Sequence, residues 1–340
     1  MSELADAVRR AEGSESEELR EMAAELRSGE RFLITTHEGP DGDALGSMLA
    51  LNEILTQLGK DSVMFMAAKE FPLPVEYRFL PLEEVFHEPP ADVADRVVVF
   101  ADCGNIDRMP LDWVRPGETH ILNIDHHHDN TRFGSVNLVD TAACSTATIV
   151  FGLAKALGAE LSPRIATALY VGLVTDTGRF SYQNTNPETH RIAAELIEAG
   201  VQVNDVYRRL YERVPDEKLR LISRALARVE RHADDRLAIT YITTEDYAAA
   251  GASEVLTEGI IDFLRSLERA VIAAVVRDQL DAGAKQRKVS LRSNERDVDV
   301  SAIARKHGGG GHALAAGFAT DLGYEEIVAL LGAELGADDR

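Results

Sequence analysis

Short apolar runs alternate with helix-like segments over the first two-thirds of the chain. The apolar runs are RFLITT at 31–36, SVMFMA at 62–67, VVVFA at 97–101 and HILNID at 120–125. Helical patterns cover about 44–58 and begin again near Ser145. This repetition predicts an α/β fold with a mostly parallel sheet flanked by helices, in which ligands bind at the carboxyl ends of the strands.

A second, smaller α/β pattern occupies the last third of the chain. Its apolar runs are LAITYIT at 237–243, AVIAAVVRD at 270–278 and KVSLRS at 288–293, with helical stretches near 254–268, 299–306 and 324–335. A length of 340 residues suits two domains. We therefore expect one domain at 1–186 and another at 236–340, joined by a helical connector at 187–235. The connector helices fit a helix bundle of the first domain equally well.

The balance of charges limits the choice of partners. The chain has 57 acidic and 36 basic residues, which gives a net charge of −21. This argues against a protein that coats long duplex DNA, because such proteins need many Lys and Arg to displace counterions. A small anionic substrate remains compatible if metal ions and a local basic patch override the overall field in one cleft.

The sequence also gives an expectation about location. No segment has the roughly 20 uncharged apolar residues of a membrane span, and the acidic start MSELADAVRRAEGSESEELREM lacks the basic and apolar regions of a signal peptide. Cys103 and Cys144 are too few for a disulfide framework and are expected to be buried small side chains. We expect a cytoplasmic protein without a membrane partner.

Metal-binding residue types follow three of the predicted strands. The first strand leads into a Gly/Pro loop that carries His37, Asp41 and Asp43, VVVFA is followed by Asp102, and HILNI is followed by the segment 125–128, DHHH. Each segment alone could be a turn or a helix cap. Their joint occurrence at three strand ends favours a functional site.

A fourth segment, ATALYVGLVTDTGRF, ends an apolar run at Asp176. Periodicity does not decide whether 166–174 is a buried helix or a strand. With this segment, the chain offers enough ligands for two divalent cations that share a carboxylate: His37, Asp41, Asp43, Asp102, His126 and Asp176. Two such ions can activate a water molecule and stabilise charge during displacement at phosphorus. Carboxylates and imidazoles without Cys favour Mn²⁺, Mg²⁺, Fe²⁺ or Co²⁺ over structural zinc.

The segments HEGPDGDALGS, ADCGN, DHHHDN and VTDTGRF resemble, in this order, the four motifs of the DHH phosphoesterase superfamily. VSLRS and GGGGHALAAGF resemble the DHHA1 domain of that superfamily. The resemblance covers about 20–335 and is greatest to the bifunctional oligoribonuclease and pAp phosphatase type, the NrnA-like nanoRNases. It implies a metal-binding catalytic DHH domain at 1–186, a substrate-binding DHHA1 domain at 236–340, and an active site in the cleft between them.

The resemblance also implies a role for each motif residue. Two ligand sets share Asp102 as a bridge: His37, Asp41 and Asp102 for one metal ion, and Asp43, Asp102, His126 and Asp176 for the other. Among the catalytic residues, His127 would contact the scissile phosphate and Asp125 would orient a histidine. Family members typically use manganese. His128 departs from the motif, as a solvent-facing neighbour or an additional phosphate contact, and the sequence does not decide between the two.

Features of the second domain suit an anionic ligand. Arg292 and Ser293 end a predicted strand, and Arg can bind a phosphate through two hydrogen bonds. Gly309, Gly310 and Gly311, followed by His312, can bring backbone N–H groups close to an anion. A flexible linker is the alternative, but the apolar ALAAGFAT that follows favours a packed segment.

These features lead to the hypothesis of a metal-dependent hydrolase that cleaves short oligoribonucleotides to 5′-mononucleotides and also dephosphorylates pAp. Alternative substrates are linear or cyclic dinucleotides such as pApA and c-di-AMP. An inorganic pyrophosphatase is a further alternative, against which GGGGHALAAGF argues, and a non-catalytic nucleotide sensor would be expected to lack some metal ligands. The charge and length disfavour an exonuclease of the RecJ type that acts on long substrates. A homodimer is compatible with the sequence.

Overall fold

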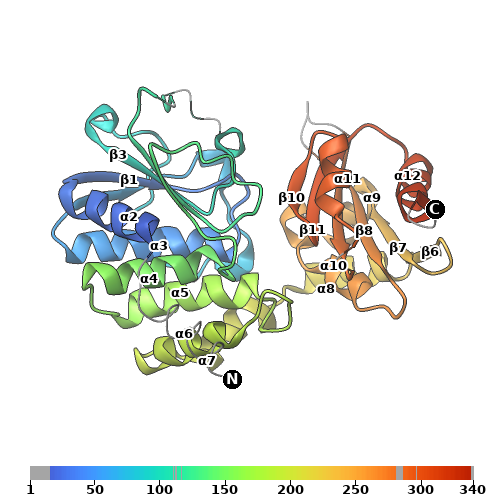
Figure 1. Cartoon of the computed structure of the whole chain (residues 1–340). Helices are drawn as coiled ribbons and strands as arrows, with labels where there is room; N and C mark the ends of the chain where they lie inside the picture. The colour runs from blue at the N-terminus through green and yellow to red at the C-terminus, as the bar shows by residue number, and fades with distance from the viewer. Residues whose placement is uncertain are drawn as a thin grey trace, which may run out of the picture. The chain divides into compact units, whose positions relative to one another are not determined.

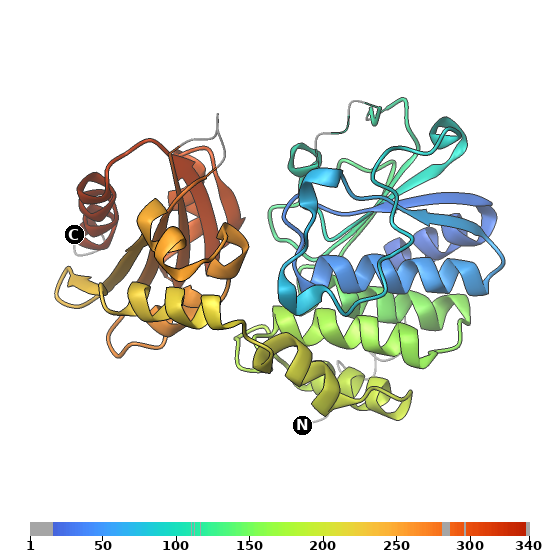
Figure 2. The same ribbon diagram turned by 180° about the vertical axis from the view of Figure 1, so that it is seen from behind.

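The computed structural model describes residues 16–109, 111, 113–115, 117–280, 286–295 and 297–337. The chain divides into two compact units, of which the first ends at Leu210 and the second begins at Tyr211. Each unit has its own sheet (Figures 1 and 2). Within the described residues, none of the helices combines the length and the apolar character that crossing a membrane requires. The expected two-domain α/β fold is confirmed.

A five-stranded sheet forms the centre of the first unit. Its order is β2-β1-β3-β4-β5, and all neighbouring strands run parallel. The strands are β1 (Arg31–Thr35), β2 (Asp61–Met64), β3 (Val97–Ala101), β4 (Ile121–Asp125) and β5 (Val136–Val139). β2 is shorter than the predicted run, and β5 was not predicted. Because the strands are parallel, the carboxyl ends of β1, β3 and β4 lie at the same edge of the sheet.

The helices of the first unit form layers on the sheet. They are α2 (Glu17–Ser28), α3 (Gly42–Gln57), α4 (Thr146–Leu157), α5 (Pro163–Asp176), α6 (Pro187–Glu198) and α7 (Val203–Tyr207), followed by the π-helical turn η5 (Arg208–Glu212). α3 packs against β1 and β2, and α5 packs on α3 and α4 (Figure 1). Gly46 allows α3 and α5 to come close, because a Cβ atom there would lie 2.3 Å from the carbonyl oxygen of Ala168.

The segment whose type the sequence left open is the helix α5. Ser162 caps its N-terminus by accepting a hydrogen bond from the backbone N–H of Ile165, and Pro163 occupies the first turn. Both residue types are typical of helix starts. The apolar run at 166–174 is therefore a helix that is buried almost all round, and Asp176 is its last residue.

Loops and short 3₁₀ turns cover part of the sheet of the first unit. The turns are η1 (Ala68–Glu70), η2 (Val75–Tyr77), η3 (Val93–Asp95) and η4 (Ile106–Arg108). Met109 and Val114 from this region pack in one buried cluster with Leu33, Val98 and Phe100 of the strands. An apolar core thus holds the strands whose carboxyl ends carry the metal-binding residue types.

A six-stranded mixed sheet forms the centre of the second unit. Its order is β10-β11-β9-β8-β7-β6, and among its neighbouring strands the pair β7 and β8 is parallel while the others are antiparallel. The strands are β6 (Glu230–His232), β7 (Leu237–Ile242), β8 (Ile272–Asp278), β9 (Arg287–Ser293), β10 (Gly310–His312) and β11 (Ala315–Thr320).

Helices of the second unit build two apolar clusters on this sheet. They are α8 (Asp216–Leu226), α9 (Thr244–Ala250), α10 (Ile260–Arg265), α11 (Val300–Lys306) and α12 (Tyr324–Ala337), with the 3₁₀ turn η6 (Glu254–Thr257). One cluster joins the strands to α11 and α12, and the other joins them to α8, α9 and α10. The predicted connector at 187–235 is shared, since α6 and α7 belong to the first unit and α8 belongs to the second.

Candidate metal centre

The predicted metal ligands come from strand ends and helix ends of the first unit. His37 follows β1, Asp102 follows β3, and His126 follows β4. Asp41 is the N-cap of α3, where its Oδ1 atom accepts hydrogen bonds from the N–H groups of Asp43 and Ala44. Asp176 ends α5.

These six side chains form two neighbouring groups. Atoms of His37, Asp41 and Asp102 that can bind a metal lie within 4.8 Å of one another, and the same holds for Asp43, His126 and Asp176. Asp102 reaches both groups, because its Oδ2 lies 3.6 Å from Nε2 of His37 while its Oδ1 lies 3.7 Å from Nε2 of His126. The arrangement would allow one carboxylate to serve two cations.

The spacing of these atoms fits a shared cation better than direct hydrogen bonds. Nε2 of His126 lies 3.9, 3.7 and 3.6 Å from carboxylate oxygens of Asp43, Asp102 and Asp176, respectively. These distances exceed those of N–H···O hydrogen bonds. Two ligands that each bind one cation at about 2.1 Å lie roughly 3.0 to 4.2 Å apart, depending on the angle at the ion. The residues therefore fit a divalent cation.

Asp43 is held in place by backbone donors. Its Oδ2 atom accepts a hydrogen bond of 2.6 Å from the N–H of Thr146, and its Oδ1 atom accepts one of 2.8 Å from the N–H of Ala147. Gly172 of α5 leaves the space for this carboxylate, because a Cβ atom there would lie 2.7 Å from Oδ1 of Asp43. The buried carboxylate is thus oriented before any ligand binds.

Burial and mutual repulsion shift the pKa values of the side chains in both ligand groups. Burial, and then the charges of Asp102 and Asp176, raise the pKa of Asp43 well above its ordinary value. Burial also raises the pKa of Asp176 to about 7. Burial acts upward on Asp102 too, but the neighbouring histidines outweigh it and hold the pKa of Asp102 below its ordinary value. Burial lowers the pKa of His126, but four carboxylates outweigh it and raise that pKa to about 9, namely those of Asp176, Asp102, Asp43 and Asp125. The raised pKa values of Asp43 and Asp176 therefore reflect burial and repulsion among close carboxylates, which a divalent cation would relieve.

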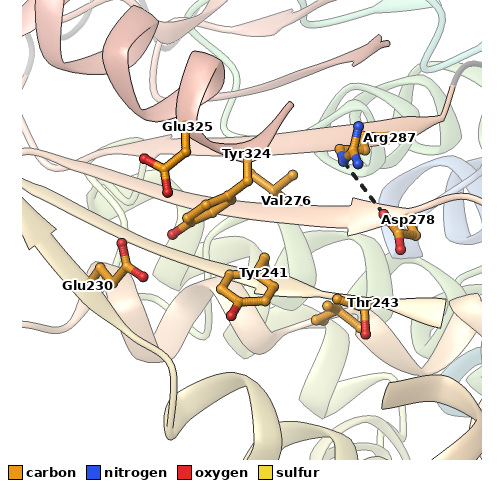
Figure 3. Close-up of a pocket in the computed structure, with 9 residues that line it drawn as sticks. Glu230, Tyr241, Thr243, Val276, Asp278, Arg287, Tyr324 and Glu325 are labelled. Atoms are coloured by element: carbon orange, nitrogen blue, oxygen red, sulfur yellow. Dashed lines mark ion pairs between the residues drawn. The ribbon is translucent and has the colours of Figure 1, made fainter. Parts of the chain in front are cut away.

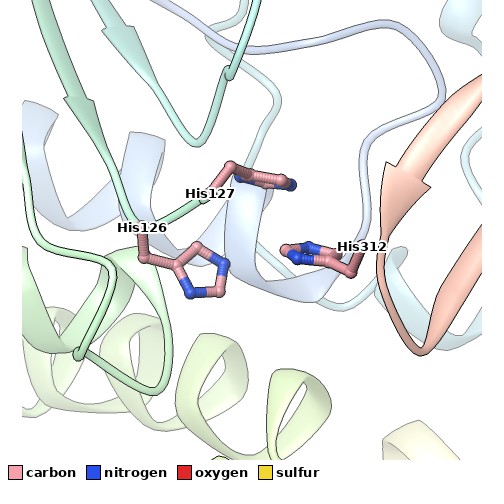
Figure 4. A group of neighbouring side chains, drawn as sticks. All are labelled: His126, His127 and His312. Atoms are coloured by element: carbon pink, nitrogen blue, oxygen red, sulfur yellow. The ribbon is translucent and has the colours of Figure 1, made fainter. Parts of the chain in front are cut away.

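Beside the two groups lies a hydrogen-bonded chain of three side chains. The rings of His126 and His127 are neighbours in the loop after β4, with centroids 5.0 Å apart (Figure 4). Nδ1 of His127 lies 2.7 Å from Oδ1 of the fully buried Asp125, and the amide of Asn130 donates to Oδ2 of Asp125 over 2.5 Å. Burial lowers the pKa of His127, but the bond to Asp125 outweighs it and raises that pKa. His128, by contrast, is exposed.

The predicted substrate residues of the second unit lie on neighbouring strands. Arg292 of β9 pairs with Ala315 of β11, and His312 of β10 pairs with the same Ala315. The Nη1 atom of Arg292 donates to the carbonyl oxygen of Leu291. Ser293 is buried, and its hydroxyl donates to the carbonyl oxygen of Glu295 over 2.8 Å. The strand pairing places the end of β9 beside β11, and the bond from Ser293 holds the turn that follows β9.

The glycine run is packed in part. A Cβ atom at Gly309 would lie 2.1 Å from the carbonyl oxygen of Gly317, and Gly311 has φ of +133°. A Cβ atom at Gly310 would meet no atom within 4 Å. The packed positions rule out a flexible linker, as the sequence indicated.

Family models match both units. Residues 31–173 match the model of the DHH family, N-terminal domain, and residues 234–335 match the DHHA1 domain. The bifunctional oligoribonuclease and PAP phosphatase NrnA of Thermus thermophilus is 35% identical to this chain over 326 residues, which cover 94% of the chain and 95% of that protein. The chain belongs to the DHH family. The expected family and its hydrolase class are confirmed.

Other relatives of this DHH-family chain agree in sequence or in fold. The protein of the same name from Bacillus subtilis is 27% identical over 84% of the chain and 88% of its own length. A crystal structure of an exopolyphosphatase-related protein from Bacteroides fragilis matches with a TM-score of 0.82 at 23% identity, and covers 94% of this chain and 96% of that one. The RecJ structure in complex with Mn²⁺ from Thermus thermophilus has a TM-score of 0.51 at 17% identity, and covers 94% of this chain and 54% of that one. The likenesses to these two solved structures show the fold.

Phosphoesterases of the DHH family depend on metal ions, and this DHH chain has the clusters of acidic and histidine side chains that could hold them. Sequence reasoning missed residues that support these clusters. Thr146 and Asn130 bind carboxylates of the site, and Asn184 donates to Oδ2 of Asp176 over 3.4 Å. For Thr146, the sequence offered one signal, which is its position next to Ser145 at the start of a predicted helix.

A cavity of about 320 Å³ in the second unit does not suit a phosphate substrate (Figure 3). Its lining includes the carboxylates of Glu230, Asp278 and Glu325, and its one arginine, Arg287, lies 3.6 Å from Asp278. The excess of acidic groups would repel an anion. The predicted substrate residues are not among those that line it.

Proposed function

We propose that this chain hydrolyses short oligoribonucleotides to 5′-mononucleotides and removes the 3′-phosphate of pAp, using two divalent cations. The observation that carries the proposal is the gathering of two ligand groups around Asp102 in the first unit. The 35% identity to an oligoribonuclease and PAP phosphatase over 94% of the chain supports the substrate class.

The cation ligands follow from the two groups. His37, Asp41 and Asp102 would hold one ion, and Asp43, Asp102, His126 and Asp176 would hold the other. When bound, the cations supply a water molecule activated for attack and neutralise charge on the phosphate. Mn²⁺ is the ion we favour, because the ligands are carboxylates and imidazoles without thiolates, and because the resemblance to the DHH family implies manganese. Mg²⁺ and Co²⁺ suit the same ligands.

His127 would act on the phosphate itself. Its bond to Asp125 holds Nδ1 and favours the protonated ring. A protonated imidazole can donate to a phosphate oxygen and stabilise the charge that develops there. Asp125 does not need to touch the substrate for this role, because it orients His127.

The second unit would bind the end nucleotide. Arg292, His312 and the backbone N–H groups of Gly310 and Gly311 would provide donors for phosphate. The N–H of Gly309 donates to the carbonyl oxygen of Ala304 over 2.9 Å, so we assign Gly309 to the packing of the run. Because the hydroxyl of Ser293 already binds Glu295, we assign Ser293 to the support of the strand end. Binding between the DHH and DHHA1 domains stays a prediction, as do the cytoplasmic location and a homodimer.

The test is product analysis with Mn²⁺ and 5′-labelled RNAs of two to five and of twenty-four nucleotides, with pAp and pyrophosphate in parallel. We expect rapid release of mononucleotides from the short RNAs and phosphate from pAp. Asp102→Ala should abolish both, whereas Asp107→Ala, an exposed carboxylate five positions further on, should not. Cleavage of pyrophosphate alone, or of none of the substrates, would refute the proposal.

A further inference from the structure

Thr146 binds two carboxylates of the metal centre at once. It is the first residue of α4 and is fully buried. Its hydroxyl donates to Oδ1 of Asp102 over 2.9 Å, and its backbone N–H donates to Oδ2 of Asp43 over 2.6 Å. One residue thus connects a carboxylate of the first ligand group to a carboxylate of the second.

The two hydrogen bonds depend on different parts of Thr146. Asp43 is held by backbone N–H groups of Thr146 and Ala147, which the first turn of a helix leaves without partners inside the helix. The side chain of Ser145 caps the same turn by accepting from the N–H of Thr148 over 3.3 Å. A change of the Thr146 side chain therefore leaves the donors to Asp43 in place and removes only the bond to Asp102.

The orientation of the Asp102 carboxylate determines where both of its oxygens lie. Its backbone has φ of +59°, in the left-handed region, because it lies where the chain turns after β3. Its Oδ2 lies 3.6 Å from Nε2 of His37, while its Oδ1 lies 3.7 Å from both Nε2 of His126 and Nδ1 of His127. A rotation of the carboxylate would move both oxygens away from these positions together.

We propose that the hydroxyl of Thr146 is a positioning group that fixes the carboxylate of Asp102 between the two ligand groups. A neutral hydroxyl orients this carboxylate without cancelling its charge, so the carboxylate stays available to a cation, whereas a lysine in the same place would compete with the cation. This inference rests on the proposed function only in taking Asp102 as a metal ligand. Partners of metal ligands typically contribute on the order of 10- to 100-fold to metal affinity.

The test compares Thr146→Val, which keeps the size and removes the hydroxyl, with Thr146→Ser, which keeps the hydroxyl. Thr148→Val is the matched control, because the Thr148 hydroxyl lies on the same helix and donates to the carbonyl oxygen of Ser145. The dissociation constant for Mn²⁺ is measured on the full chain without substrate, by the electron paramagnetic resonance signal of free Mn²⁺. Circular dichroism verifies that each variant is folded.

We expect Thr146→Val to raise the dissociation constant for Mn²⁺ on the order of 10- to 100-fold, and Thr146→Ser and Thr148→Val to stay close to wild type. The inference is overturned if Thr146→Val binds Mn²⁺ as tightly as wild type, or if Thr148→Val weakens binding as much. If the wild type binds Mn²⁺ but cleaves no RNA, the proposed function fails while the comparison of Val with Ser still decides the role of Thr146. If the wild type binds no Mn²⁺, both proposals fail.

Discussion

Oδ1 of Asp125 lies 2.7 Å from Nδ1 of His127, and Asp125 is fully buried. The carboxylate therefore accepts a hydrogen bond from that ring nitrogen, and Nε2 is the ring nitrogen of His127 that does not face Asp125. Asn130 binds the other oxygen of Asp125, so both oxygens are engaged inside the protein. The pair has the geometry of an oriented acid, and its atoms lie within 4.8 Å of those of Asp102, the carboxylate shared by the two ligand groups.

Asp125→Asn should lower kcat on short RNA by roughly 10- to 100-fold, because a neutral amide orients the ring less firmly and no longer favours its protonated form. The affinity for Mn²⁺ should change little, since Asp125 is not in either ligand group. Steady-state kinetics on a dinucleotide at saturating Mn²⁺ measures the effect, and Asp129→Asn, an exposed residue in the same loop, is the control. An unchanged kcat would show that His127 does not depend on this bond.

Removal of metal should destabilise the first unit. A cation at a free concentration of about 100 times its dissociation constant stabilises the folded state by about 2.7 kcal/mol. This corresponds to a rise in Tm of roughly 5–10 °C. Thermal unfolding in EDTA and in Mn²⁺ at pH 8 measures this difference. Equal Tm values under both conditions would contradict a metal site.

Asp176→Asn should separate metal binding from stability. The pKa of Asp176 is raised to about 7, above its ordinary value of 3.8, so ionisation destabilises the metal-free fold as the pH rises between these values. At pH 8 in EDTA, the variant should therefore be at least as stable as wild type, but its Tm should rise less with Mn²⁺. Asp205→Asn, an exposed partner of Arg209, should respond to Mn²⁺ as wild type does. A loss of Tm in EDTA would show that Asp176 stabilises the fold by itself.

The positions of the strand carboxyl ends could be predicted from the sequence because they depend on the local pattern of apolar residues. Each of β1, β3 and β4 is a short buried run, and parallel pairing brings their ends to one edge. Asp102 and His126 follow such runs directly, so their meeting follows from the fold class alone.

The support of these ligands could not be predicted because it joins distant segments. Thr146 binds Asp43, which lies 103 positions earlier in the chain, and nothing in the local pattern of either segment encodes this contact. A different reason explains why four strands could not be predicted from the sequence, namely β5, β6, β10 and β11. They are short or rich in glycine and alanine, and their pairing in the sheet rather than their own propensity makes them strands.

Asp246 should be a main electrostatic support of the second unit. Its carboxylate is buried, accepts from the N–H of Thr243 at the start of α9, and binds Arg224 and Arg228. Burial raises its pKa, but the hydrogen bonds from Arg228, Thr243 and Arg224 outweigh burial and hold the pKa well below its ordinary value. Asp246→Asn should cost about 2 kcal/mol at pH 7, within the range for hydrogen bonds to charged groups.

The pH dependence of this effect has a definite sign. Because the folded-state pKa of Asp246 is depressed, its stabilisation is present above its ordinary pKa of 3.8 and is lost progressively as the pH falls below that value toward the folded-state pKa. Urea unfolding at pH 7 and at pH 3 should therefore show the gap between wild type and Asp246→Asn narrowing in acid. Asp205→Asn, which breaks an exposed pair with Arg209, should cost little at either pH. A gap that stays constant would place the effect in packing instead of charge.

Alanine substitutions at two glycines of the GGGG run should affect different properties, one the stability of the fold and the other the binding of substrate. A Cβ atom at Gly309 would lie 2.1 Å from the carbonyl oxygen of Gly317 and 2.6 Å from Cβ of Phe318, so Gly309→Ala should cost roughly 1–3 kcal/mol of stability in urea unfolding. Gly310 has open space around its Cβ position, so Gly310→Ala should leave stability unchanged. If the loop approaches the substrate phosphate, the added methyl group should raise KM for dinucleotide RNA and leave kcat nearly constant, since it would weaken ground-state and transition-state binding alike. A wild-type KM for Gly310→Ala would place the phosphate elsewhere in the second unit, with Arg292 as the next residue to test.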